Sequence, residues 1–414
     1  MSHNIPLSGA RLWYALMEMA TIGATPRGGC NRQTLTPEDG EGRALLARWG
    51  EACGLTLTTD RLGNMALLRP GRDPSRRPVA IGSHLDTQPT GGKFDGVLGV
   101  LAGLEVMRAL HEAGAETEAP ILLVNWTNEE GARFSPPMMG SGAAMGLFTE
   151  AETLARTDPD GIRFGDALEA IGARGDADPA ALLDIEAYFE LHIEQGPVLE
   201  REGLDVGIVT HALAQRWFDV TVTGEESHGG GGMAGRRDAL VGAAQLIAEI
   251  EAIALRSGSD GRGTVGRVAV HPSSRNVVPS RATFTVDFRH RDDAALDGME
   301  AALREAAARV VAERGLGAEV SVFWTSPETP FDRTLAARLR DAATARGFRQ
   351  RDMPTGIGHD AVYVARGVPS VMLFTPCEGG ISHNEAEAIT PAWAEAGLLV
   401  LADAVLATAG LVRA

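Results

Sequence analysis

The 414-residue chain has few cysteines and a shortage of positive charge, and each shortage excludes a class of function. Its three cysteines, Cys30, Cys53 and Cys377, contain no CxxC spacing. They predict reduced, buried thiols in the cytoplasm rather than a disulfide framework. Acidic residues outnumber basic ones by 55 to 38, and the formal net charge is −17. This charge argues against nucleic-acid or anionic-membrane partners, because both attract basic surfaces.

Long hydrophobic runs are also missing from the sequence. The first twenty residues, MSHNIPLSGARLWYALMEMA, lack the basic start, apolar core and cleavage site of a secretory signal. No apolar stretch approaches the ~20 residues that a membrane span needs. With 44% hydrophobic and 22% charged residues, the composition is that of a soluble globular protein, and we expect it in the cytoplasm.

Several catalytic signatures are absent as well. The chain has no GxSxG nucleophile elbow and no CxxCH haem-attachment motif. GGK at 91–93 lacks the spacing and the following Ser or Thr of a P-loop. The glycine run at 229–232 does not open a helix directly after a buried strand, as a dinucleotide fingerprint would.

Apolar strands and helices alternate in the first half of the chain. We expect strands at 79–86, 121–128 and 189–196, and helices at 42–55 and 96–114. This alternation predicts an α/β layer with a mostly parallel sheet. After residue 328 the helix, strand, helix order resumes.

The order of elements changes between residues 213 and 327. Strands and long helices there follow the order β-α-β-β-α-β, the split βαβ arrangement of ferredoxin-like domains. A chain of this length also favours two domains. The sequence therefore predicts a catalytic metal-binding α/β domain at 1–212 and 328–414, with an inserted α+β domain at 213–327.

Histidines and carboxylates gather beside glycines and at the expected strand ends. The candidate metal ligands lie in GSHLD, KFDG, NEEG, ELHIEQG and ISHNE: His84, Asp95, Glu130, His192 and His383. A hydrolytic pair of metal ions needs a bridging carboxylate, terminal ligands and an open position for water. Asp95 is the expected bridge. We expect His84 and His192 to hold one ion each, with Glu130 and His383 completing the pair.

Two further carboxylates belong to this constellation. Asp86 lies two residues after His84, so in a strand both side chains share a face and Asp86 can orient the imidazole. Glu129 precedes Glu130 at a strand end, where neighbours point to opposite sides and one of them can face the reacting water as general base. Alone, a strand-end histidine is more often structural, and an EE pair is more often solvated surface. The combined set predicts a metal-dependent hydrolase.

These motifs resemble the M20 metallopeptidase clan, and within it the amidohydrolase branch of N-carbamoyl-L-amino-acid hydrolases, β-ureidopropionases and allantoate amidohydrolases. The resemblance covers nearly the whole chain, through TPRGGCNRQTLTPED, GSHLDTQPTGGKFDGVLGV, NEEGARF, ELHIEQGP, RRDAL, NVVPS, GHDA and GISHNEAE. HIEQGP and GISHNEAE are specific to the branch, whereas HLD and EEG occur throughout the clan. The resemblance implies two divalent ions on the five ligands, Glu129 as base, and an inserted domain that acts as a lid and forms a homodimer.

Substrates of this branch carry a carboxylate and a ureido or amide group. Arg289, at the end of RATFTVDFRH, is the candidate for the carboxylate because a guanidinium pairs with it bidentately, and the resemblance agrees. Asn276 is a further hydrogen-bond donor, and Gln195 is the candidate for the ureido amide. Gly358 offers backbone groups. The neighbouring pair His359 and Asp360 we interpret as structural or supporting residues.

His228 in GEESHGGGGM matches the family histidine that reaches the partner subunit's site and stabilises the developing oxyanion. The chain departs from the pattern here. Relatives carry a His-Ala-Gly-x-Thr-Pro-Met segment, whereas HGGGGM lacks the Thr-Pro pair and is one residue shorter. Four glycines raise the entropic cost of ordering the loop, so the departure bears on the role of His228 and on substrate preference.

The predicted activity is metal-dependent cleavage of the carbamoyl C–N bond of an N-carbamoyl-L-amino acid, with release of amino acid, carbon dioxide and ammonia. Zn, Mn, Co and Ni suit the ligand set equally. Hydrolysis of allantoate or 3-ureidopropionate is an alternative on the same site, as is a dipeptidase or aminoacylase activity. A non-catalytic small-molecule-binding homologue is the alternative from another class. Such a protein is expected to lose at least one of His84, Asp95 and Glu129, which this chain retains.

Overall fold

The computed structural model describes residues 5–412, and the chain divides into two compact units. The first unit comprises the chain up to His211 and from Pro330 onward, and the second comprises Ala212–Thr329. Each unit has its own hydrophobic core. The second unit is therefore an insertion between two halves of the first.

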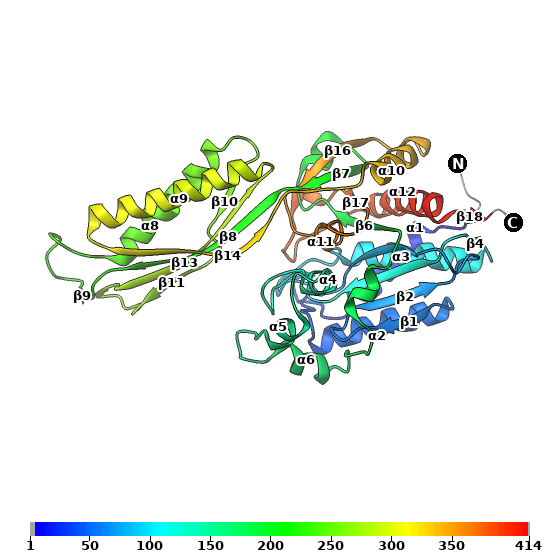
Figure 1. The fold of residues 1–414 in the computed structure, drawn as a ribbon, viewed down its shortest axis with the longest axis horizontal. Coiled ribbons are helices and arrows are strands. Elements are labelled where there is room, and N and C mark those ends of the chain that lie inside the picture. The colour runs from blue at the N-terminus through cyan, green and yellow to red at the C-terminus, as the bar shows by residue number, and fades with distance from the viewer. Residues whose placement is uncertain (1–4, 413–414) are drawn as a thin grey trace. The chain divides into compact units, whose positions relative to one another are not determined.

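The first unit contains a nine-stranded mixed sheet (Figure 1) with the order β1-β2-β5-β3-β6-β17-β7-β15, and β16 pairs with β7. The central strands β5, β3, β6 and β17 are parallel, whereas β1 and β2 are antiparallel to their neighbours and β7 is antiparallel to β17. The expected α/β class is confirmed, and the four central strands form a parallel part of this mixed sheet. The strands are β1 (Thr56–Thr59), β2 (Met65–Arg69), β3 (Val79–His84), β5 (Ile121–Trp126), β6 (Ala187–Ile193), β7 (Val206–Ala212), β15 (Thr329–Pro330), β16 (Gln350–Thr355) and β17 (Ser370–Thr375).

The central strands are buried along their whole length, because helices and loops cover both faces of the sheet. Helices α3 and α12 pack on β3, β6 and β17, and α1 and α10 pack against α12. The helices of this unit are α1 (Gly9–Met19), α2 (Pro37–Ala52), α3 (Val97–Glu112), α4 (Met139–Ala144), α5 (Glu150–Ala155), α6 (Phe164–Ala170), α7 (Val198–Glu202), α10 (Arg333–Ala345), α11 (Asp360–Val364) and α12 (Pro391–Ala409), with 3-10 turns η1 (Pro179–Leu183) and η2 (Glu378–Gly380). Strands β4 (Glu116–Thr117) and β18 (Leu411–Val412) form a small separate ladder.

Helix α12 corrects one expectation from the sequence. It is the one helix in residues 5–412 whose length and hydropathy would allow it to cross a membrane. However, 72% of its apolar window is buried inside the protein. Contacts with α1, α3 and α10 account for its hydrophobicity, as in the core helix of a globular domain.

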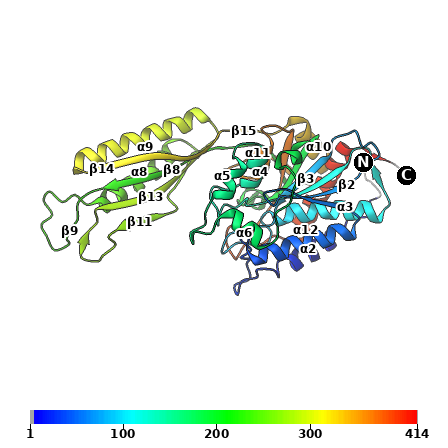
Figure 2. The same ribbon diagram turned by 60° about the horizontal axis from the view of Figure 1, so that its bottom comes forward.

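The second unit has the predicted β-α-β-β-α-β order, extended by one further sheet strand, β10, and by the short strands β9 and β12. Its five-stranded sheet runs β10-β13-β8-β14, with β11 paired to β13, and α8 and α9 lie side by side over one face (Figure 2). Its elements are β8 (Ala214–Thr223), β9 (Ser227–His228), α8 (Ala239–Arg256), β10 (Arg262–Thr264), β11 (Val268–His271), β12 (Val277–Val278), β13 (Arg281–His290), α9 (Asp293–Arg314) and β14 (Gly317–Ser326). Burial alternates along β13, which packs Phe284, Val286 and Phe288 into the core and directs Asp287 and Arg289 to the other face.

Candidate metal centre

The carboxyl ends of the parallel strands bring the predicted ligands together, as such ends meet at one edge of a sheet. His84 is the last residue of β3, and His192 lies near the end of β6. Their Nε2 atoms are 3.6 and 3.0 Å from Asp95 Oδ1. His383 Nε2 lies 3.4 Å from Asp95 Oδ2 and 3.3 Å from Glu130 Oε2. The five residues therefore form two groups that share Asp95.

His84 and His192 were expected to hold one ion each, but the structure places them together. His84 and His192 face the same oxygen of Asp95, while Glu130 and His383 gather at the other. The reason is the sheet order, because β3 and β6 are adjacent parallel strands and their last side chains reach the same place. Sequence alone did not give this adjacency.

The donor atoms of the first group fit a divalent cation. His84 Nδ1 lies 3.0 Å from the carbonyl oxygen of Asp86, and His192 Nδ1 lies 2.9 Å from that of Ile193. A carbonyl accepts only from N–H, so in each neutral ring Nε2 carries the lone pair. These lone pairs point at a carboxylate oxygen, and the buried His84 Nε2 has no hydrogen-bond partner. A cation between these atoms would satisfy all of them.

Asp95 is the most strongly ionised carboxyl of the site. Burial opposes its ionisation, yet the neighbouring residues His192 and His84 hold its pKa well below the usual range. Burial raises the pKa of the Glu130 carboxyl well above its usual range, and the nearby Asp95 raises it further. A pair of like charges this close favours the binding of cations.

Glu129 stands beside the first group. Its Oε2 atom lies 3.5 Å from His84 Nε2, so Glu129 and Glu130 point to different parts of the site. Burial raises the pKa of the Glu129 carboxyl well above its usual range, against the lowering effect of His84, and the carboxyls of Asp360, Glu130 and Asp95 add to the rise. A carboxyl with a raised pKa holds a proton more readily than an ordinary glutamate does, as a group that shuttles a proton must.

Asp86 reaches the site differently from the prediction. β3 ends at His84, so Asp86 lies beyond the strand. Its backbone carbonyl lies 3.0 Å from His84 Nδ1, and its carboxylate lies farther away, at 3.7 Å. The Asp86 carboxylate accepts from the backbone N–H groups of Glu129 and Glu130, both at 3.3 Å. Asp86 thus fixes the turn that carries these two glutamates.

Gln195 lies inside the site rather than at its rim. Its Nε2 donates to Asp95 Oδ2 at 2.8 Å and to Ser382 Oγ at 3.0 Å, while its buried Oε1 has no hydrogen-bond partner. Gln195 and His383 both have positive φ, +54° and +53°. Asn128, directly before Glu129, has φ +61°. Non-glycine residues in this strained region cluster at functional sites.

Three supporting residues were not singled out from the sequence. Gln88 Nε2 donates to Glu130 Oε2 at 2.8 Å, while Ser382 and Glu387 contact Asp95. All three lie within TQPTGGKFDG or GISHNEAE. The motifs therefore located the segments, but no spacing rule shows which of their polar side chains turn inward.

The GHDA segment lies behind His192. The ring of His359 packs against that of His192 with centroids 4.5 Å apart, and its Nε2 contacts Thr355 Oγ1. Glu190 and His359 form a third potential ligand group with His192. However, Glu190 already accepts from Ser83 Oγ and from the N–H of Ala361, both at 2.9 Å. This group is therefore a hydrogen-bonded support for His192. Gly358 lies in the loop before α11.

The other predicted substrate residues belong to the second unit. Arg289 donates through Nε and Nη2 to the carboxylate of Asp287, at 2.6 Å for the shortest contact. His228, on β9, pairs with Val277 of β12, and the N–H of Gly229 donates to the carbonyl of Asn276. His228 and Asn276 are therefore neighbours. Arg289 lies near the C-terminal end of β13, where it pairs with Gln215 of β8.

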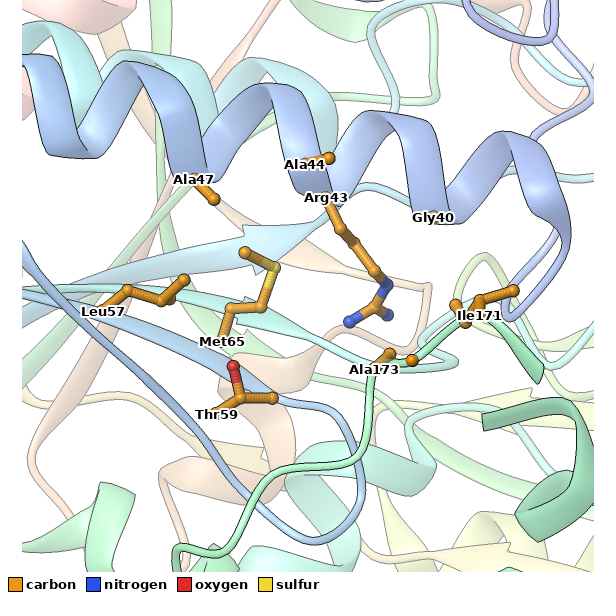
Figure 3. Close-up of a pocket in the computed structure, with 10 residues that line it drawn as sticks. Gly40, Arg43, Ala44, Ala47, Leu57, Thr59, Met65, Ile171 and Ala173 are labelled. Carbon is orange, nitrogen blue, oxygen red and sulfur yellow. The ribbon is translucent and has the colours of Figure 1, made fainter. Parts of the chain in front are cut away.

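A hollow of about 200 Å³ lies elsewhere in the first unit, between α2, β1, β2 and residues 171–173 (Figure 3). Its walls are mostly apolar, with Arg43 as the charged residue. The three guanidinium nitrogens of Arg43 are already bonded to Asp39, the carbonyl of Gly63 and Thr127 Oγ1. This hollow contains none of the predicted site residues and offers no uncommitted charge to a polar ligand.

Comparison with known proteins agrees with this geometry. Residues 80–407 match the peptidase family M20/M25/M40. The N-carbamoyl-L-amino-acid amidohydrolase of Rhizobium meliloti is 46% identical over 99% of both chains, and that of Geobacillus stearothermophilus is 37% identical over 92% of this chain and 94% of the relative. The crystal structure of a hydantoinase/carbamoylase family amidase from Burkholderia vietnamiensis superposes with a TM-score of 0.93 at 48% identity, over 99% of both chains.

These comparisons confirm the resemblance that the motifs predicted. The match covers both units and includes His84, Asp95, Glu129, Glu130, His192 and His383, the residues that the fold brings together. The chain belongs to peptidase family M20/M25/M40, and within it to the hydantoinase/carbamoylase amidohydrolases.

Proposed function

We propose that this protein hydrolyses the carbamoyl C–N bond of N-carbamoyl-L-amino acids with the help of two divalent metal ions. The observation that carries the proposal is the pair of ligand groups sharing Asp95, with Glu129 beside them. The relatives support this substrate class over its nearest alternative. The relative from Rhizobium meliloti that bears this activity in its name is 46% identical, whereas a Bacillus subtilis relative named allantoate amidohydrolase is 32% identical.

Two cations fit the residues present. His84, His192 and Asp95 would hold one, and Asp95, Glu130 and His383 the other. Bound cations of this type lower the pKa of water and polarise a carbonyl oxygen. Zn, Mn, Co and Ni all suit this combination of imidazole and carboxylate.

Glu129 is the proposed general base and acid. Its carboxylate takes a proton from the water that attacks the ureido carbon. It then gives this proton to the amino-acid nitrogen as the C–N bond breaks. The products are the amino acid and carbamate, which decomposes to carbon dioxide and ammonia. The raised pKa of Glu129 suits this shuttle, because the group must hold the proton between the two transfers.

The substrate's polar groups have matching partners. Gln195 Nε2 is committed to Asp95 and Ser382, so its unpartnered Oε1 is the atom available to accept an N–H of the ureido group. For the substrate carboxylate we propose Arg289. Asp287 occupies the Nε and Nη2 edge of the guanidinium and fixes its plane. A planar guanidinium pairs with carboxylates bidentately, which is the chemistry that the substrate carboxylate needs. Asn276 and the backbone around Gly358 are proposed as further contacts.

We also propose a homodimer through residues 213–327, in which His228 serves the partner's site. Arg289 pairs with Gln215 at one end of β13, and Arg281 pairs with Thr223 at the other. Residues 281 to 289 span about 27 Å at about 3.4 Å per residue. β9, with His228, lies beyond the Arg281 end of this sheet (Figures 1 and 2). A single carbamoyl amino acid is far too short to touch Arg289 and His228 of one chain, so their joint action requires two chains.

The buried free cysteines are compatible with the reducing cytoplasm, where we propose that the protein works.

Ammonia release tests the proposed reaction. The panel is N-carbamoyl-L-alanine, N-carbamoyl-L-methionine, 3-ureidopropionate, allantoate and a dipeptide, each with and without a chelator. The dipeptide is followed by amino-acid release. We expect chelator-sensitive turnover that is fastest for an N-carbamoyl-L-amino acid. Faster turnover of allantoate or the dipeptide would assign one of the alternative activities. Turnover that survives complete metal removal would refute the metal mechanism.

Subunit mixing tests the shared site. His228→Ala and Glu129→Gln are each expected to be almost inactive as homodimers. In a mixed dimer, the site that retains Glu129 in one chain can receive His228 from the other. An equal mixture after subunit exchange should recover about a quarter of wild-type activity, since half the dimers are mixed and each has one complete site. No recovery, with mixed dimers present, would place His228 in the site of its own chain or outside catalysis.

A further inference from the structure

Glu387 connects two segments that each carry a proposed metal ligand. Its side chain is buried. Oε1 accepts hydrogen bonds from the backbone N–H groups of Phe94 and Asp95, at 3.0 and 3.1 Å. Oε2 lies 3.0 Å from Ser382 Oγ, next to His383. One carboxylate thus joins the segment ending in Asp95 to the segment that contains His383.

Ser382 extends this connection to the Asp95 side chain. Its Oγ lies 3.1 Å from Asp95 Oδ2, and Gln195 Nε2 donates to both of these atoms. Asp95 is therefore held at its backbone N–H by Glu387 and at Oδ2 by Ser382 and Gln195. Its Oδ1 remains directed at His84 and His192.

Gly92 shows how closely Glu387 packs on this segment. A Cβ atom at Gly92 would overlap the carboxyl group of Glu387. The carboxylate therefore lies directly on the backbone of the GGKFDG motif, and no side chain fits between them. This packing explains the second glycine of the motif by a contact rather than by a turn.

We propose that Glu387 is a positioning residue that holds Asp95 in the orientation needed to bridge two cations. The inference rests on the metal site of the proposed function. Bridging is sensitive to orientation, because metal–ligand distances must hold within about 0.2 Å. Residues behind the ligands commonly set this geometry. Glu387 does so by accepting hydrogen bonds, so its acceptor oxygens matter more than its charge.

Glutamine can take over this role. In Glu387→Gln, the side-chain oxygen can accept from the N–H groups of Phe94 and Asp95. The amide nitrogen can donate to Ser382 Oγ, whose hydrogen is then directed to Asp95 Oδ2. Glu387→Ala loses these contacts, and Glu387→Met keeps the length of the side chain without its oxygens.

Asp60 provides a matched control in the same unit. It is also buried, and its carboxylate accepts from the backbone N–H groups of Leu62 and Asn64 at 2.8 and 2.9 Å. A side-chain donor, Asn64 Nδ2, adds a third bond at 2.7 Å. Asp60→Ala therefore removes a similar set of hydrogen bonds without touching a proposed metal ligand.

The experiment measures zinc binding to the full-length protein after metal removal, by competition with a chromophoric chelator. Thermal unfolding of each metal-free variant reports its folding. We expect two ions on the wild type, affinity about 10–100-fold weaker for Glu387→Ala, and near wild-type affinity for Glu387→Gln. Asp60→Ala should lower the unfolding temperature and leave zinc affinity unchanged.

Three results would overturn the inference. The first is that Glu387→Ala binds zinc as tightly as the wild type does. If that variant does not fold, the corresponding result is that Glu387→Met and Glu387→Gln bind zinc with equal affinity. The second is an equal loss in Asp60→Ala, and the third is a Glu387→Gln as weak as the alanine variant. A wild type that binds no zinc would overturn the metal site together with this inference. A wild type that binds two ions but releases no ammonia from carbamoyl substrates would refute only the proposed substrate. The zinc affinities of the Glu387 variants would still test the positioning role of Glu387.

Discussion

Gly96→Ala is the sharpest test of the candidate metal centre. Gly96 directly follows Asp95 and has φ +68° and ψ −45°. A Cβ atom there would lie 2.5 Å from Cδ2 of His84 and closer still to Nε2, its proposed ligand atom. Carbon atoms in contact normally lie about 3.5–4.0 Å apart, so the imidazole must move by about 1 Å or more. That movement exceeds the tolerance of about 0.2 Å for a metal ligand.

The expected magnitudes follow from two separate effects. The positive φ costs any non-glycine residue about 1–3 kcal/mol, and forcing a methyl group into the buried imidazole costs about 1–3 kcal/mol more. Gly146 is a control for the positive φ, because its φ is +70° and nothing lies within 4 Å of its Cβ position. Gly146→Ala should therefore show the backbone cost alone.

The assay combines metal content with urea unfolding of the metal-free proteins. Gly146→Ala should retain two ions per chain and lose about 1–3 kcal/mol of stability. Gly96→Ala should lose the ion of the His84 group and about 2–6 kcal/mol of stability, the sum of both effects. A Gly96→Ala protein that holds two ions as tightly as Gly146→Ala would refute the role of His84 Nε2 as a ligand.

Three other predictions concern the base, the anion contact and the thiols. Glu129→Gln should bind metal normally and lose about 10²–10⁴-fold in kcat, and near-full activity in a steady-state assay would mean that another group moves the proton. Arg289→Ala should raise KM for carboxylate substrates by about 10–100-fold, because a hydrogen bond to a charged group is worth about 1.5–3 kcal/mol. Arg289→Lys should not restore the wild-type KM, and an unchanged KM in Arg289→Ala would contradict the proposed contact with the substrate carboxylate. Burial raises the pKa of the Cys377 thiol to about 12 and raises the pKa of the Cys30 and Cys53 thiols. Ellman's reagent at pH 8 should therefore react slowly with the native protein and titrate three thiols after denaturation. A rapid reaction with the native protein would show that a thiol is exposed.

The sequence predicted the helices and strands better than it predicted which strands lie side by side in the sheet. The helix expected at 96–114 and the strand expected at 121–128 correspond to α3 and β5 within a few residues, because each is an apolar run of the length typical of its kind. The motifs also placed every proposed ligand at a strand end or glycine turn. Lateral order in the sheet was not predictable, since periodicity reports which face is buried and not which strand lies alongside. That order is what puts His84 and His192 on one oxygen of Asp95.

Side-chain direction was the second limit of the sequence. Asp86 was predicted to orient His84 through its carboxylate, on the assumption that the strand continued beyond His84. The chain turns instead, so the carboxylate lies 3.7 Å from His84 Nδ1 and also holds the backbone of Glu129 and Glu130. A polar residue just past a strand end has no periodic rule for its direction. Its partners depend on loops from distant parts of the sequence.

The GGKFDG motif illustrates how the two limits combine. Its second glycine is required by Glu387, and its last glycine is required by His84, since a side chain at either position would overlap those groups. Both partners are distant along the chain, so the pattern of glycines cannot be explained from local turn preferences alone. Asp95, between them, is held at its backbone nitrogen and at both carboxylate oxygens by different segments. The glycines allow these segments to approach closely enough to fix one carboxylate, and on that closeness the predicted effects of Gly96→Ala and Glu387→Ala both depend.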